Sequence, residues 1–161
     1  MNEFLAWLEA SVAGEFMRSS GVWTYGVVNL AHILGVSSLF GSLLVLDLRL
    51  LGVWRRIPLA ALETPVVPIA IAGFVLAAGS GVFMIATNAT DYVGNPFLLI
   101  KFPAIGLGLL NFAALSRLPA WRARRSRELD ARERRQLAVA GAFSLACWLT
   151  AIGAARMIGY W

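Results

Sequence analysis

Four polar or ionisable side chains stand inside long apolar stretches of the sequence, namely Asn29, His32, Lys101 and Asn111. Such groups are costly inside a bilayer, so they are candidates for function. His32 is the only histidine of the chain. A neutral imidazole is the usual form in which histidine binds haem iron or another metal, and it can also relay protons or bond a neighbouring helix. We therefore predict a cofactor site formed by all four residues, with His32 as the metal ligand.

The other three residues also have more than one interpretation. Lys101 can snorkel to the membrane interface on its long stem, or it can pair with a haem propionate or serve as an amine ligand. Asn29 lies three residues before His32, on nearly the same helix face, and can orient a cofactor or bond another span. Asn111 can likewise contact a cofactor or make a hydrogen bond that packs two helices.

Sulfur ligands offer a second type of metal chemistry. The thioethers of Met17, Met84 and Met157 suit Cu(I), but we expect His32 to lie on the order of 10 Å deeper than Met84 by helical rise. Cys147 is the single cysteine and stands in an apolar run, which predicts a small buried hydrophobic residue. Paired carboxylates, a catalytic triad, a P-loop and a dinucleotide fingerprint are all absent from the sequence. Catalytic residues therefore stay unassigned, and whether the protein is an enzyme stays open.

The elements that must position these residues are membrane spans. The chain of 161 residues is 59% hydrophobic and 14% charged, whereas soluble domains are about 45–50% apolar. A transmembrane helix needs roughly 20 mainly apolar residues, and four segments meet this requirement: 22–46, 66–86, 96–115 and 137–155. The sequence predicts an all-α membrane protein, a single domain over residues 1–161 with a four-transmembrane-helix bundle. Residues 3–17 are predicted to form an amphipathic helix lying in the outer interface.

Arginine placement predicts the orientation of these spans. Three arginines follow the first span and eight follow the third, whereas the loop after the second contains Asp91 and no base. Basic loops face the cytoplasm, so we expect both termini outside it. The arginines border membrane spans and would meet phospholipid headgroups first. The net charge of +5 therefore indicates the lipid bilayer as a partner and argues against nucleic acid.

Three stretches carry a family resemblance: residues 29–35 (NLAHILG) with Gly41, residues 47–52 (DLRLLG), and residues 95–101 (NPFLLIK) with Asn111. They resemble an uncharacterised family of small four-span bacterial membrane proteins, over most of the chain. This resemblance implies the bacterial inner membrane and little about activity.

A histidine early in one span and a lysine opening a later span are also similar, more distantly, to two other groups. These are the membrane haem-containing protoporphyrinogen oxidase family and the copper-resistance D family. In the oxidase family the corresponding histidine and lysine form the functional pair, which implies that role for His32 and Lys101.

The leading functional hypothesis is binding of haem b for electron transfer, sensing or oxidation. His32 would be the axial ligand, and Lys101 a propionate partner or second ligand. One histidine cannot ligate a haem from both sides within one chain, so the haem would be five-coordinate, ligated by a second residue type, or shared in a homo-oligomer. The alternatives are transport of copper or a small solute beside His32, and a structural subunit of a larger membrane complex.

Overall fold

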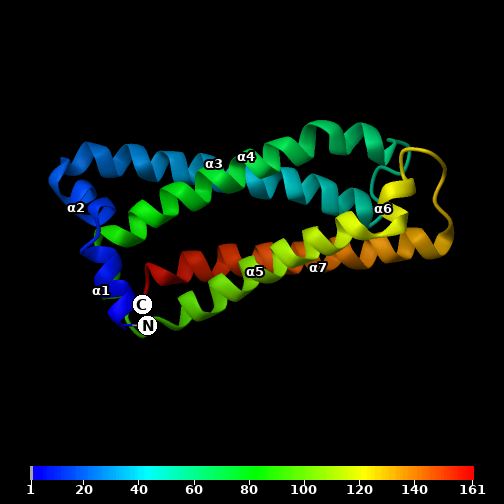
Figure 1. Cartoon of the computed structure of the whole chain (residues 1–161). Coiled ribbons are helices and arrows are strands. Elements are labelled where there is room, and N and C mark those ends of the chain that lie inside the picture. Colours follow the sequence, from blue (N-terminus) through cyan, green and yellow to red (C-terminus); the bar gives the residue numbers. More distant parts are fainter. Residues whose placement is uncertain (1) are drawn as a thin grey trace. The chain divides into compact units, whose positions relative to one another are not determined.

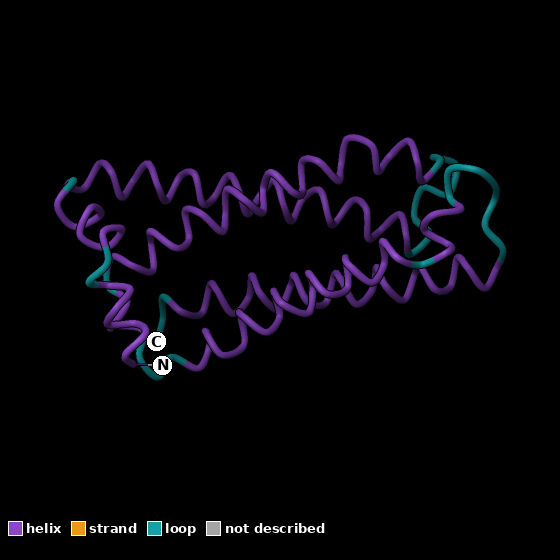
Figure 2. The backbone as a smooth tube through the Cα atoms, in the orientation of Figure 1, coloured by secondary structure: helices purple, strands orange, loops and turns teal. Residues whose placement is uncertain are grey.

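The computed structural model describes residues 2–161, and every regular element in them is a helix (Figures 1 and 2). Four helices are long and apolar enough to cross a membrane: α3 (Gly21–Leu50), α4 (Leu59–Thr87), α5 (Pro96–Arg117) and α7 (Ala131–Ile158). The prediction of an all-α, four-span membrane protein is confirmed.

The N-terminal segment is helical but broken in two. Instead of one helix over residues 3–17, the chain forms α1 (Asn2–Glu9) and α2 (Val12–Ser19). The break has a local cause, because the Ser11 hydroxyl accepts a hydrogen bond from the Gly14 amide and caps α2. Two further short helices, η1 (Ala89–Tyr92) and α6 (Pro119–Ala123), follow α4 and α5.

The long helices extend beyond the apolar runs that predict them. α7 begins at Ala131 rather than at residue 137, because Asp130 and Glu133 form a capping box. The Asp130 carboxylate accepts from the Glu133 amide at 2.8 Å, and the Glu133 carboxylate accepts from the Asp130 amide at 3.0 Å. α4 likewise begins at Leu59, seven residues before the predicted start at residue 66. Hydropathy marks the part of a helix that suits lipid, whereas caps and polar residues extend the helix past it.

The chain forms two compact units, each of which we describe by itself. Unit 1 contains residues 2–39 and Ala70–Asn95, and unit 2 contains Phe40–Ile69 and Pro96–Trp161. α3 and α4 therefore each contribute one part to unit 1 and one to unit 2.

In unit 1, α3 and α4 approach almost to backbone contact. A Cβ at Gly35 would lie 2.6 Å from the Ala77 amide nitrogen, and one at Gly73 would lie 2.5 Å from the Leu39 amide nitrogen. Only glycine fits at such a crossing, as in small-x-x-x-small packing motifs. Gly73, Ala77 and Gly81 are spaced as such a motif, and all three face α3 here.

In unit 2, α5 and α7 run side by side (Figure 1). The Trp148 indole packs against Gly108, where a Cβ would meet the ring at 3.1 Å. Near the loops, buried apolar side chains from α3, α4, α5, α6 and α7 form one cluster, made of Leu46, Leu50, Leu59, Leu115, Ala120, Trp121 and Leu137. This cluster anchors the loops that carry most of the arginines.

Candidate functional site

The His32 side chain is oriented by the facing helix α4. Its Nδ1 lies 2.9 Å from the Ala77 carbonyl oxygen and 3.1 Å from the Ser80 hydroxyl oxygen. A carbonyl oxygen can only accept, so Nδ1 carries the hydrogen in this bond and Nε2 carries the ring's lone pair. Ser80 in turn donates to the Leu76 carbonyl at 2.5 Å. The interhelical bond therefore fixes both the tautomer and the orientation of the half-buried imidazole.

Gly81 makes the space that the imidazole occupies. A Cβ on Gly81 would lie 3.1 Å from His32 Cε1 and 3.4 Å from His32 Nδ1. Ala77, Ser80 and Gly81 lie on one face of α4, three and one residues apart, and together they form the surface against which the ring lies. The small-x-x-x-small spacing of Ala77 and Gly81 is typical of helix packing, but nothing in the sequence connects these residues with His32.

The other predicted site residues have separate surroundings. Asn29 is half-buried on α3, one turn before His32 in unit 1. In unit 2, the Asn111 side-chain amide donates to the Ala140 carbonyl at 3.0 Å and joins α5 to α7, which is the packing bond that the sequence allowed. Lys101 is half-buried in α5, with its Nζ 5.9 Å from the Phe102 ring centroid. No salt bridge to Lys101 occurs within residues 2–161.

Two of the predicted thioethers converge in unit 1. Met17 from α2 and Met84 from α4 line one cavity of about 430 Å³, together with Arg18, Tyr25 and Tyr92. His32 is not among its lining residues. In the described part of the chain no group of three or more histidine, cysteine, aspartate or glutamate side chains is placed to hold a metal ion.

Polar contacts that local sequence patterns do not predict join the N-terminal helices to the end of α4 and to η1. Glu9 accepts two bonds of 2.7 Å from Thr90, one from the amide and one from the hydroxyl. These bonds hold the pKa of Glu9 below its usual value of 4.5. Arg18 donates to the Thr87 carbonyl at 3.1 Å and to the Glu9 carbonyl at 2.8 Å. Glu9 and Thr90 are 81 residues apart, so no local spacing in the sequence predicts their contact.

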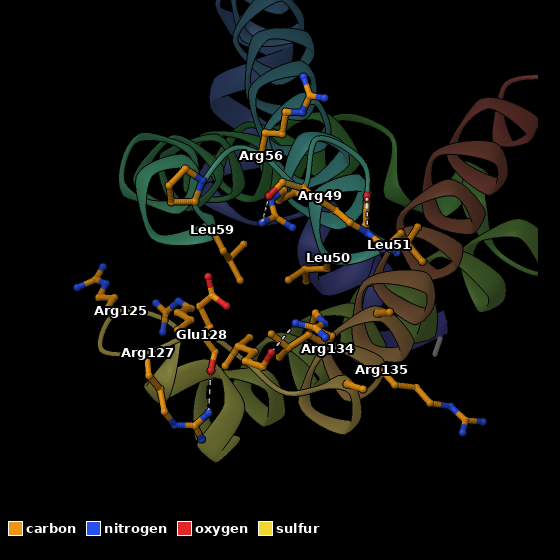
Figure 3. A pocket seen from close by; sticks show the side chains of 18 of the residues that line it. Arg49, Leu50, Leu51, Arg56, Leu59, Arg125, Arg127, Glu128, Arg134 and Arg135 are labelled. Carbon is orange, nitrogen blue, oxygen red and sulfur yellow. Dashed lines mark hydrogen bonds between the residues drawn. The ribbon is translucent and has the colours of Figure 1, made fainter.

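Unit 2 contains a larger cavity of about 920 Å³ between the α3–α4 loop and the α5–α7 connection (Figure 3). Both loops were predicted to lie on one side of the membrane, and they line this single cavity. We call it the basic cavity, because its lining includes eight arginines: Arg49, Arg55, Arg56, Arg124, Arg125, Arg127, Arg134 and Arg135.

Loop geometry holds two of these arginines in place. Gly52 takes a φ of 103° and ends α3, after which the Val53 amide donates back to the Leu48 carbonyl at 3.0 Å. Arg55 Nε donates to the Gly52 carbonyl at 3.2 Å, and Arg49 Nε donates to the Ile57 carbonyl at 2.8 Å. Asp47 and Arg49 lie near the same end of α3 but form no salt bridge within residues 2–161, and Arg49 instead donates to the loop.

The two carboxylates of this region differ in their partners. Glu63 is 2% exposed and binds both Arg124 and Arg125, with 2.7 Å between Oε1 and Arg125 Nε. Asp47 is 3% exposed and bonds Ser144, while its Oδ2 has no partner within residues 2–161. Glu63 precedes the apolar run that predicts the second span, so nothing in the sequence indicates that this residue is buried.

Comparison with protein-family models, with curated proteins and with solved structures gave no match. The resemblances of residues 29–35, 47–52 and 95–101 therefore stay hypotheses. A functional assignment must rest on the geometry of the residues themselves.

Proposed function

We propose that this multi-pass membrane protein binds haem b, with His32 as the axial ligand, for electron transfer, sensing or oxidation. The observation that supports the proposal best is the 2.9 Å bond between His32 Nδ1 and the Ala77 carbonyl. Histidines that bind metals usually donate their other ring N–H to a carboxylate or a backbone carbonyl, which orients the ring and makes it a better ligand. His32 is held in that state by α4.

The donor set fits a haem better than a bare metal ion. A haem needs only one or two axial protein ligands, because the porphyrin supplies the other four. A structural or transported ion needs three or four protein ligands, and the described residues contain no such cluster of histidine, cysteine or acidic side chains. The two thioethers in the unit 1 cavity, Met17 and Met84, keep Cu(I) as the second candidate.

Each residue has a defined part in this proposal. His32 holds the iron through Nε2, and the Ala77 carbonyl and Ser80 hydroxyl keep the ring in that orientation. Asn29, one turn away, contacts the porphyrin edge or a neighbouring helix. Lys101 is the proposed partner of a propionate, a role based on the sequence. The haem, when bound, supplies one-electron chemistry at its iron.

The absorption spectrum of protein purified from haem-replete membranes tests the proposal. We expect a Soret band in the wild-type protein and its loss or shift in His32→Ala. Asn111→Ala is the matched control, because it also removes a polar intramembrane side chain but one with a known helix partner, and its spectrum should equal that of the wild type. A wild-type protein without porphyrin that also gives no saturable spectral change with added haem would overturn the proposal.

Metal analysis of the same preparations tests the second candidate. Copper in a fixed ratio to protein, lost in Met84→Leu and in Met17→Leu, would favour copper binding in the unit 1 cavity. If the wild-type protein contained neither haem nor copper, the result would favour a structural subunit in which His32 joins two helices.

We further propose that the arginine-bearing loops face the cytoplasm of a bacterium and that the protein lies in its inner membrane. The positive-inside rule supports this orientation, and so does the fact that both loops line one cavity. A reporter fused after Trp161 should be active outside the cytoplasm, and one inserted at Ser126 should be active inside. A C terminus in the cytoplasm would contradict this orientation.

A further inference from the structure

The basic cavity carries more positive charge than its acidic neighbours neutralise. Of its nineteen lining residues, eight are arginines and one, Glu128, is acidic. Two further acids bind lining arginines from outside, since Glu63 binds Arg124 and Arg125 and Glu133 binds Arg127. Asp130 also acts on Arg127 by its charge. Eight positive charges thus face four negative ones, which leaves a strongly attractive site for an anion.

Five of these arginines make no salt bridge within residues 2–161, namely Arg49, Arg55, Arg56, Arg134 and Arg135. In Figure 3, Arg49 and Arg134 lie on opposite sides of the opening, whereas Arg56 and Arg135 point away from it. The guanidinium groups of Arg49 and Arg134 are therefore placed to hold a common ligand.

Both opposed arginines are held in position by backbone oxygens. Arg49 donates from Nε to the Ile57 carbonyl at 2.8 Å, and Arg134 donates from Nη1 to the Leu129 carbonyl at 2.6 Å. A guanidinium group has five N–H donors in a rigid fork, so several donors of each remain for a ligand. Arginine forks bind phosphate in the bidentate manner, and ordering them before binding lowers the entropy cost.

Part of the cavity wall is apolar, unlike the wall of a site for a free anion. Leu51 is exposed and Leu129 is half-buried, and both line the cavity, whereas Leu50, Leu59 and Leu137 are already buried in the cluster described above. Leu50 ends α3, Leu59 begins α4, and Ala131 begins α7 nearby. Three of the long apolar helices thus end or begin at the cavity, and the ends of helices that cross a bilayer meet the lipid headgroups.

We propose that the basic cavity binds the phosphate group of an anionic phospholipid, between Arg49 and Arg134. A soluble phosphate ester has the same charged group but no acyl chain to cover the accessible Leu51 and Leu129. The combination of paired arginines, apolar walls and position at the helix ends therefore assigns the site to a lipid. This site lies wholly in unit 2 and is independent of any cofactor at His32.

Lipid titration of the full-length protein in detergent, followed by native mass spectrometry, tests this assignment. Phosphatidylglycerol should bind with a defined stoichiometry and at least tenfold more tightly than phosphatidylcholine. The double variant Arg49→Gln/Arg134→Gln should lose at least tenfold in affinity for phosphatidylglycerol. The matched control is Arg122→Gln/Arg132→Gln, which removes the same charge from two exposed arginines outside the cavity and should lose less than twofold.

Two results would overturn the assignment. An equal loss in both double variants would show that lipid responds to diffuse charge rather than to a site. Displacement of phosphatidylglycerol by glycerol phosphate at a similar concentration would assign the cavity to a soluble ester, whereas failure to compete supports the lipid.

Loss of the arginine hydrogen bonds to loop carbonyls would also lower the stability of the loops in the glutamine variant. A second double variant, which keeps the charge, separates this effect from lost lipid binding. Arg49→Lys/Arg134→Lys retains the charge but not the bidentate fork. It should bind phosphatidylglycerol several-fold more weakly than the wild-type protein and more tightly than the glutamine pair, with an unchanged melting temperature in the absence of lipid. Wild-type affinity in the lysine pair would contradict specific recognition by the two forks.

Discussion

The surroundings of His32 in unit 1 and the basic cavity in unit 2 accommodate polar groups in opposite ways. His32 lies within a span, and its imidazole bonds a backbone carbonyl and a hydroxyl of the facing helix, where glycines let the backbones approach. The arginines of the basic cavity lie at helix ends, where loop carbonyls and the buried Glu63 hold them. Inside the bilayer a polar group must find its partner on a neighbouring helix, whereas at the interface it can also use loops, headgroups and water.

This difference predicts where substitutions act most strongly. Contacts in unit 2 that bury charge should be the most sensitive to loss of one partner, and contacts in unit 1 should be the most sensitive to added volume. Substitutions that remove a charged partner in unit 2 or add volume in unit 1 test this contrast.

Glu63→Gln should be the most destabilising change. Glu63 is 2% exposed and Arg124 is 11% exposed, so the substitution leaves a nearly buried cation without its anion. Breaking a buried pair in this way costs about 3–5 kcal/mol, and we expect the lower end because Arg125 is largely exposed. Denaturant unfolding of unit 2 should report it, with the exposed Glu128→Gln as the control that changes little. Equal losses of unfolding free energy in the two variants would show that the ion pairs of Glu63 contribute no more to stability than the exposed Glu128 does.

Gly73→Ala should destabilise unit 1, because its Cβ would lie 2.5 Å from the Leu39 amide nitrogen, a backbone atom that cannot turn aside. Overpacking of this kind costs about 1–3 kcal/mol. Gly79→Ala on the same helix meets nothing within 4 Å and should stabilise α4 by up to about 1 kcal/mol through helix propensity. Melting temperatures that move in the same direction for both variants would argue against the close crossing of α3 and α4.

Acidification should release α1 with a small effect on the rest of the protein. The folded-state pKa of Glu9 is lowered by its two bonds from Thr90, so the contact stabilises α1 above the usual pKa of 4.5 and is lost as pH falls through the lowered value. The protection factors of the amides of residues 2–9, measured against the intrinsic exchange rate at each pH, should therefore fall below about pH 4.5. Glu9→Gln should show faster exchange already at neutral pH, and Glu3→Gln should not. Protection factors that depend neither on pH nor on Glu9 would mean that apolar contacts alone hold α1.

The sequence predicts the scaffold well and its polar contacts poorly, for a physical reason. Long apolar runs determine the four spans, and the spacing of Gly73, Ala77 and Gly81 indicates a close helix contact, because both are periodic and local. The partners of Glu63 and Glu9 are remote in sequence and leave no local pattern. His32 is intermediate, since its isolation in an apolar run marks it as a candidate, but only the fold shows that Ala77 and Ser80 orient it.

Titration of haem into the haem-free protein tests the central claim most directly. The proposal predicts a saturable difference spectrum in the Soret region for the wild-type protein, with one haem per chain or per dimer. His32→Ala should abolish saturation, and Ser80→Ala should weaken binding only modestly, because the Ala77 carbonyl still orients the ring. Lys101→Met should raise the haem dissociation constant without changing the ligand-dependent spectrum. Superimposable titrations of the wild-type protein and His32→Ala would contradict the assignment of His32 as the haem ligand.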